Sequence, residues 1–217
     1  EETAGCRCFV EFAEDQSRFP EFRGDRTFIE AEEGGLLTEA TIPKRNDEII
    51  DQSGVTIGAG VDLGQRDEAE LRRLGVDEKI IEKVRPFLGL RREEAERALD
   101  ARPLTLNETE ARELTDKVHN DIIRQVARNF NRDSEFDFFG LPPEAQTVIA
   151  DVAIQFGPDL GREDRTPRFW GFVTRGEWDK AIAELEDFGD DFGPRREKEA
   201  DRLKRARDKL PTPPTQP

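Results

Sequence analysis

The feature that most limits the possible folds of this chain is a long apolar stripe near its middle. Between residues 107 and 131 apolar side chains recur at steps of three or four: Ala111, Leu114, Val118, Ile122, Val126 and Phe130. This spacing places them on one face of an α-helix of roughly six turns. Thr105 and Glu108 are three residues apart at its start and predict a capping box. A helix of this length can join two lobes.

A short β region precedes this helix. Residues 36 to 64 are rich in Thr, Ile, Val and Gly, with a turn signal at 53–54 and a strand signal at 55–57. From residue 67 onward the periodicity predicts helices at 67–74, 77–87, 91–101, 107–131, 142–156, 177–188 and 194–209. The helix at 142–156 has only a narrow polar face and is expected at the centre of the larger lobe. The pattern predicts an α+β, mainly helical fold with a small antiparallel β lobe and a helical lobe.

The two ends of the chain differ from the part between them. Residues 1–24 mix Phe with charged residues at spacings that fit neither a helix nor a strand, and are interpreted as an N-terminal extension. Asp25 and Thr27 can cap a short helix that Gly34-Gly35 would end, because glycine adopts the left-handed conformation at little cost. Residues 210–217 are a Pro-rich tail or linker. One domain is therefore expected over residues 25–209.

The charge of the chain limits its partners. With 49 acidic and 34 basic residues the formal net charge is −15, which disfavours binding to the phosphate backbone of a nucleic acid. The same charge would oppose binding to an anionic cell wall unless a locally basic cleft or salt screening weakens the repulsion. No apolar run reaches the roughly 18 residues of a membrane span.

The cysteines and the histidine do not suggest a metal site. Cys6 and Cys8 are separated by one residue, and ring strain disfavours a disulfide at that spacing. Two Cys ligands cannot close a structural zinc site, and His119, the one histidine, lies far away in a helical stretch. Neither a metal nor a cofactor is expected.

Three side chains offer the chemistry of glycoside cleavage. That reaction needs one carboxyl that stays protonated, and across the sugar ring a carboxylate or hydroxyl that orients water. Glu33 is predicted at a helix end, where the helix dipole, the neighbouring Glu32 and an apolar helix face each raise a carboxyl pKa. Thr56 and Asp62 lie on a segment with four glycines, which allows close approach to a ligand. Composition alone does not select them, since most Glu residues of an acidic chain are solvated and most Gly-rich turns are structural.

A family resemblance does single out Glu33, Thr56 and Asp62. Ala31-Glu32-Glu33-Gly34, followed by the run from Gly54 to Gly60, resembles the phage-type lysozymes of glycoside hydrolase family 24. In those enzymes a catalytic Glu precedes a Gly at the end of the first helix, and a strand reads Thr-Ile-Gly-x-Gly. The chain is more similar to the pesticin-type muramidase domains, since Asp62 follows Thr56 by six residues. Asp51 stands near the position used by the phage enzymes and is the second choice for this carboxylate.

The resemblance extends over about residues 26 to 208. Gln155, in the run Ala153–Gly157, matches a residue that lines the sugar cleft, and Arg196, after Pro194, matches an Arg that pairs with the catalytic Glu. Alternatively, Gln155 is an ordinary polar residue at a helix end, and Arg196 is an ordinary charged residue on a helix surface. The run Gly176-Glu177-Trp178-Asp179 resembles the Trp-containing late helix of the family. A two-lobed lysozyme-like fold, its lobes joined by the long helix, is the expected architecture.

The resemblance implies a muramidase that hydrolyses the β-1,4 bond between N-acetylmuramic acid and N-acetylglucosamine in bacterial peptidoglycan. Glu33 would donate the proton while Asp62 and Thr56 hold the attacking water, an arrangement that favours inversion. Such an enzyme would need no cofactor, would bind peptidoglycan glycan strands, and would act at the bacterial cell wall as a periplasmic or secreted protein. A lysozyme-like fold kept as a peptidoglycan-binding or scaffolding domain is the alternative, because a fold does not guarantee its chemistry. A helical interaction domain is a third reading.

Overall fold

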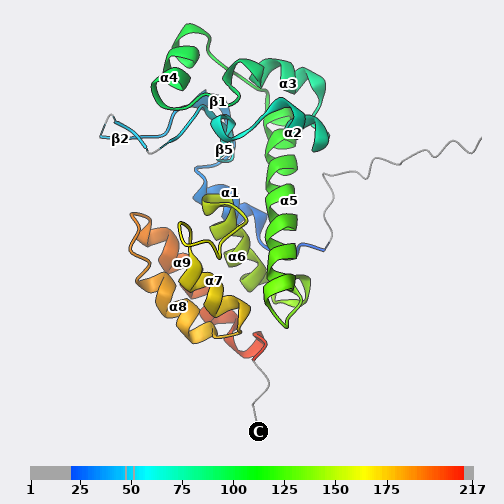
Figure 1. Ribbon diagram of the computed structural model, residues 1–217, viewed down its shortest axis with the longest axis vertical. Coiled ribbons are helices and arrows are strands. Elements are labelled where there is room, and N and C mark those ends of the chain that lie inside the picture. The colour runs from blue at the N-terminus through cyan, green and yellow to red at the C-terminus, as the bar shows by residue number, and fades with distance from the viewer. Residues whose placement is uncertain (1–20, 47, 51, 213–217) are drawn as a thin grey trace, which may run out of the picture.

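The long central helix connects two lobes of the molecule. The computed structural model describes residues 21–46, 48–50 and 52–212. In Figure 1 the helix α5 (Glu108–Asp133) runs from a smaller lobe that contains the strands into a larger lobe made of helices. It packs against the sheet at one end and against the central helix of the larger lobe at the other. The predicted α+β, mainly helical, two-lobed lysozyme-like fold is confirmed.

The smaller lobe is built on a three-stranded antiparallel sheet with the strand order β1-β4-β5. Its strands are β1 (Leu37–Thr41), β4 (Thr56–Gly58) and β5 (Val61–Asp62), and a separate hairpin pairs β2 (Lys44–Arg45) with β3 (Glu48–Ile49). The helices of this lobe are η1 (Leu63–Gln65), α2 (Glu68–Arg73), α3 (Glu78–Val84), η2 (Arg85–Phe87) and α4 (Arg92–Ala101). The predicted strand at 55–57 is observed one residue later.

The register of the sheet places two of the predicted site residues side by side. In the antiparallel pair β4–β5, Thr56 lies directly opposite Asp62, and Ile57 lies opposite Val61. Directly opposite residues project from the same face of a sheet, with their Cβ atoms only about 5 Å apart. The intervening turn contains Gly60 at φ +71°, a conformation that residues with a side chain rarely adopt. The Thr-Ile-Gly-x-Gly spacing therefore corresponds to a tight hairpin.

The first helix, α1 (Arg26–Glu32), ends as predicted. The Asp25 side chain caps it by accepting a hydrogen bond from the Phe28 N–H at 2.9 Å. Gly34 and Gly35 follow with φ of +89° and +86°, so the chain leaves the helix through the left-handed region. Glu33 is the C-terminal cap, and its own N–H still bonds to the Ile29 carbonyl at 3.1 Å.

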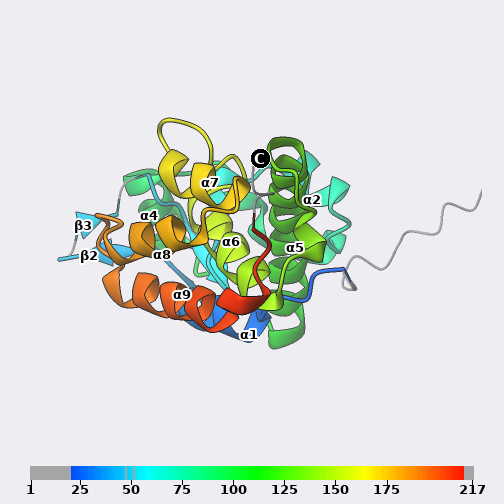
Figure 2. The same cartoon turned by 90° about the horizontal axis from the view of Figure 1, so that it is seen from below.

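The larger lobe surrounds one buried helix, α6 (Pro143–Phe156). Around it lie α1, α5, α7 (Pro167–Thr174), α8 (Trp178–Glu186) and α9 (Gly193–Ala206), as the view from below shows (Figure 2). The 3₁₀ turns η3 (Phe138–Gly140) and η4 (Arg207–Lys209) complete the lobe. All nine residues from Ala145 to Ala153 are buried. The expectation that this segment forms the central helix is confirmed.

Two features of the helical lobe and its boundary differ from the sequence-based expectation. The capping box of α5 is formed by Asn107 and Glu110: the Glu110 N–H donates to the Asn107 side chain, and the Asn107 N–H donates to the Glu110 carboxylate, both at 2.9 Å. The predicted box of Thr105 and Glu108 is therefore wrong, because Thr105 forms an isolated bridge with Glu39 of β1. Helix α7 was not predicted, since it has only eight residues and contains Gly171.

Several predictions fall at the edges of the described structure. Cys6, Cys8 and Asp51 lie outside the described residues. Residues 21–24, which belong to the proposed extension, are described: Phe22 is buried, and the Arg23 guanidinium donates to the Leu141 carbonyl at 2.8 Å. Across the described part of the chain, no helix combines the length and the apolar character needed to cross a membrane.

Candidate active site

The carboxyl group of Glu33 lies against the hairpin that carries Thr56 and Asp62. A methyl group built on Gly60 would approach Glu33 Oε2 to 2.2 Å and its carboxyl carbon to 3.0 Å. Only a glycine lets the backbone come this close to the carboxyl. The end of α1 and the β4–β5 turn, 27 residues apart in the sequence, thus meet at one point.

Asp62 is held rigidly by the glycines around it. Its Oδ1 accepts hydrogen bonds from the Gly54 N–H at 3.1 Å and the Gly64 N–H at 2.8 Å, and its Oδ2 accepts one from Gln65 Nε2 at 3.0 Å. A Cβ at Gly54 or Gly64 would come within 2.7 Å or 3.0 Å of Oδ1. These glycines therefore give the carboxylate one fixed orientation.

Thr56 is buried at the neighbouring strand position. Its hydroxyl donates to the Gly54 carbonyl at 3.4 Å, a long and therefore weak hydrogen bond. Because the bond is weak, the hydroxyl can turn toward a better partner at small cost. Thr56 thus keeps a loosely held hydroxyl beside Asp62, its cross-strand neighbour.

A cleft of about 450 Å³ opens beside Asp62, between the two lobes. Its walls come from β5, η1, α2, α5 and the end of α6, where Gln155 lies. Arg66, Arg73 and Arg165 line it together with the carboxylates of Asp62 and Glu70. The acidic excess of the chain is therefore not concentrated here, in keeping with the locally basic cleft considered from the composition.

Burial raises the pKa of Glu33, and a cation opposes that effect. Only 15% of the side chain is exposed, and the nearby Asp151 carboxylate also raises the pKa. The Arg195 guanidinium lowers it, donating from Nη2 to Glu33 Oε1 at 2.7 Å. This direction agrees with the raised pKa expected for this carboxyl, and its main cause is loss of solvent.

The arginine that pairs with Glu33 is Arg195, so the expectation that Arg196 forms this pair is corrected. Successive residues of a helix point about 100° apart, and of these two arginines it is Arg195 that reaches Glu33 at the end of α1. Arg196 is 1% exposed and donates from Nη1 to both Glu199 oxygens at 2.7 Å. Its Nη2 donates to Gln155 Oε1, so Arg196 fixes Gln155 at the edge of the cleft.

Sequence reasoning missed Asp151. It lies in the middle of α6 with 0% exposure, and both of its oxygens accept hydrogen bonds from Arg195, Oδ2 from Nε at 2.9 Å and Oδ1 from Nη2 at 2.7 Å. A charged residue within an otherwise apolar helical stretch was the available signal, because a buried carboxylate needs a partner.

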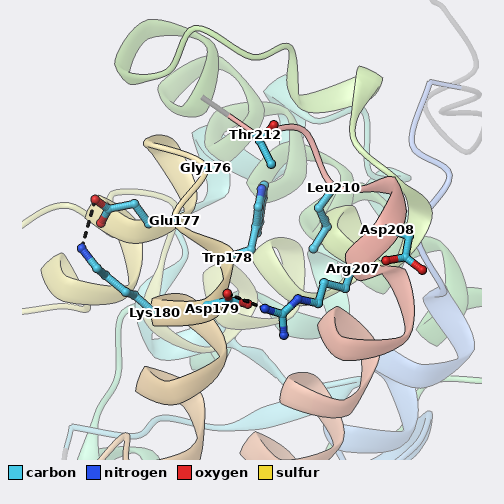
Figure 3. Close-up of a pocket in the computed structure, with 9 residues that line it drawn as sticks. All are labelled: Gly176, Glu177, Trp178, Asp179, Lys180, Arg207, Asp208, Leu210 and Thr212. Carbon is cyan, nitrogen blue, oxygen red and sulfur yellow. Dashed lines mark hydrogen bonds and ion pairs between the residues drawn. The ribbon is translucent and has the colours of Figure 1, made fainter. Parts of the chain in front are cut away.

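A second pocket lies at the far end of the helical lobe and does not join this site. Figure 3 shows it between the start of α8 and η4, with Asp179 facing Arg207 and Glu177 facing Lys180. The Trp178 indole N–H donates to the Pro211 carbonyl at 2.7 Å. These groups are satisfied by one another and serve to tie the last described residues to α8.

Among the described residues, no group of three or more His, Cys, Asp or Glu side chains could hold a metal ion.

Replacing Gly60 with Ala should disable the site. The new methyl group would displace the Glu33 carboxyl and would sit on a backbone at φ +71°, so we expect activity to fall about a hundredfold. Gly75→Ala is the matched control, because Gly75 has φ +73° and its built Cβ meets only Lys117 Nζ, at 3.7 Å. Gly75→Ala should lose about 1–2 kcal/mol of stability from backbone strain alone, and Gly60→Ala should lose more because its methyl group also clashes with Glu33. Equal activities in a hydrolysis assay would contradict this packing.

His119 should make the protein sensitive to acid. Burial lowers the pKa of its imidazole from 6.5 to about 4, so in that window the unfolded chain binds a proton that the native protein does not. The free energy of unfolding should therefore fall by about 3 kcal/mol as the pH drops through this range. Urea unfolding of wild type and His119→Gln at several pH values measures this, and parallel pH dependences would disprove it.

One comparison with known proteins bears on the chain. The family model named Pesticin, described as a bacterial toxin homologue of phage lysozyme, C-term, matches residues 23–179. The match covers well over half of the chain, including Glu33, Thr56, Asp62 and Gln155, and ends within α8 before Arg195. No curated protein matches the chain.

Proposed function

Because the chain belongs to the pesticin family of phage-lysozyme homologues, we propose that it is a muramidase that cleaves the β-1,4 bond between N-acetylmuramic acid and N-acetylglucosamine in peptidoglycan. One observation carries the proposal: the Glu33 carboxyl, its pKa raised by loss of solvent, lies against the hairpin that pairs Thr56 with Asp62. A carboxyl suited to act as an acid thus lies beside a hairpin that carries a carboxylate and a hydroxyl, which is the set of groups that glycoside hydrolysis requires.

Each group has one role in this mechanism. Glu33 donates its proton to the glycosidic oxygen as the bond breaks. Oδ1 of Asp62 accepts hydrogen bonds from two backbone N–H groups, whereas Oδ2 accepts only one, from the Gln65 side chain. Oδ2 is therefore the freer oxygen and accepts the proton from water. The weakly bonded Thr56 hydroxyl orients that water. Arg196 acts on the substrate through Gln155, whose side chain it fixes.

The proposal also sets the place of action and the domain limits. The substrate is the glycan strand of bacterial peptidoglycan, so the protein works at the cell wall, in the periplasm or after secretion. Residues 25–209 form the muramidase domain, which extends beyond the matched region because α9 supplies Arg195 and Arg196. Residues 1–24 are an extension and residues 210–217 a tail, of which Phe22 and Leu210 pack against the core of the catalytic unit.

Purified peptidoglycan provides the test. The protein should clear a suspension of it and release soluble muropeptides that mass spectrometry detects. Cosedimentation with the peptidoglycan but no clearing would instead support the alternative, a lysozyme-like fold retained for binding or scaffolding.

The stereochemistry is a separate expectation. Because Asp62 and Thr56 hold water and form no covalent intermediate, the first product should carry the inverted anomeric configuration. NMR spectra recorded on a soluble glycan within the first turnovers distinguish the two anomers. A product that retains the configuration would contradict the water-holding role.

A further inference from the structure

Behind Glu33 lies a buried group of charged side chains that the proposed chemistry does not use directly. Arg195 bridges Glu33 and Asp151, and Arg196 bridges Glu199 and Asp190, with Nη–O distances of 2.7 to 2.9 Å. The side chains of Asp151 and Glu199 are 0% exposed, and both lie at Arg195 Nε, with Asp151 Oδ2 at 2.9 Å and Glu199 Oε1 at 3.9 Å. Two carboxylates buried at one guanidinium nitrogen repel each other strongly unless one of them carries a proton.

The charges of this group balance only if it holds two protons. It contains two guanidinium groups, Arg195 and Arg196, and the four carboxyls Glu33, Asp151, Asp190 and Glu199. With every carboxyl ionised, the group would carry two uncompensated negative charges, and Asp151 and Glu199, both 0% exposed, have no solvent to offset the cost in free energy. One proton on Glu33 and one between Asp151 and Glu199 bring the sum to zero. Burial raises the pKa of both Glu33 and Glu199, in agreement with that distribution.

We propose that Asp151 and Glu199 are positioning residues that share one proton and use their remaining single negative charge to hold Arg195, so that Glu33 keeps its own proton for catalysis. Arg195 donates two hydrogen bonds to the Asp151 carboxylate, from Nε and Nη2. It donates a single hydrogen bond to Glu33, from Nη2. Without that competing charge, the whole cation would act on Glu33 and favour its ionised form. This role rests on the proposed function, in which Glu33 is the proton donor.

Other charged groups near Glu33 are accounted for separately. They come from α1, β5, α5 and α9: Glu32, Asp62, His119 and Lys198. Glu32 and Lys198 neutralise each other at 2.6 Å, and His119 is uncharged near neutral pH because burial lowers its pKa to about 4. Asp62 belongs to the water-holding side of the site. None of these four replaces the charge supplied by the Asp151–Glu199 pair.

Two variants test the proposal by direct titration of Glu33 with ¹³C NMR, with Glu33→Gln used to assign its signal. Glu199→Gln keeps the shape and still offers a hydrogen to Asp151, and it removes no charge from a pair that holds one proton. The Glu33 titration midpoint should therefore stay within about 0.5 pH unit of wild type. The double variant Asp151→Asn/Glu199→Gln removes the single charge, and the midpoint should fall by about one pH unit or more. Asp151→Asn alone is less informative, because Glu199 can then ionise and restore the charge.

The outcomes separate this proposal from the muramidase assignment. A Glu33 midpoint that falls in Glu199→Gln would show that Glu199 is ionised in the wild type and would overturn the proposal. An unmoved midpoint in the double variant would also overturn it. Glu199→Gln is a near-isosteric change, so this variant decides the matter even if the double variant fails to fold. The titration needs no turnover, and it remains informative even if Glu33 proves not to be the catalytic acid.

Discussion

Glu33→Gln should lose at least about a thousandfold of the hydrolytic rate, because the amide cannot donate the proton that a general acid supplies. The variant should still fold. Its amide oxygen can accept the hydrogen bond from Arg195 Nη2 that the carboxyl accepts at 2.7 Å, and the amide has nearly the same size and shape as the carboxyl. We therefore expect thermal unfolding and cosedimentation with peptidoglycan to remain close to wild type.

The neighbouring residue provides the control for this variant. Glu32 has the same chemistry, but its carboxylate pairs with Lys198 at 2.6 Å, and the Lys198 side chain is 58% exposed. Glu32→Gln should keep activity within about twofold, since this carboxylate contacts Lys198 and has no part in the proposed chemistry. If Glu33→Gln clears peptidoglycan at the rate of Glu32→Gln, Glu33 is not the acid.

Asp62→Asn and Thr56→Ala should each lower the rate by about a hundredfold or more, the size expected for a general base and its partner. Asparagine keeps the Oδ1 that accepts from Gly54 and Gly64, so the hairpin should hold its shape while the proton-accepting charge is lost. Thr56→Ser is the matched control for Thr56→Ala because it retains the hydroxyl. Initial rates on purified peptidoglycan measure all three variants.

Asp51 is the other candidate for the carboxylate that acts with Thr56, and the same assay distinguishes it from Asp62. The cross-strand pairing of Thr56 with Asp62 supplies a physical reason to choose Asp62. Asp51→Asn should therefore stay within about a few-fold of wild type. Loss of activity in Asp51→Asn with a fully active Asp62→Asn would assign this chain the arrangement of the phage enzymes.

The parts of this architecture that local rules determine were predictable from the sequence. The end of α1 followed from Gly34-Gly35, which supply the positive φ that the helix stop requires. The burial of α6 followed from its narrow polar face, and the length of α5 from its apolar stripe. In each case neighbouring residues carry the whole signal, and tertiary packing did not override it.

The features that depend on three-dimensional orientation were not predictable in the same way. Adjacent arginines on α9 face different neighbours, so choosing between Arg195 and Arg196 requires the rotation of that helix against α1. Glu199, which lies beside Asp151 at Arg195, is 48 residues away from it on another helix. The contact of Glu33 with Gly60 depends on how the turn between β4 and β5 packs against α1.

The most direct measurement of the central claim is the identity of the new reducing ends formed during digestion of purified peptidoglycan. Borohydride reduction followed by mass spectrometry marks the sugar at each newly cut position. The account predicts reduced N-acetylmuramic acid that increases with time in wild type and is absent with Glu33→Gln. Reduced N-acetylglucosamine, cleavage in the peptides alone, or equal reducing ends from both proteins would contradict it.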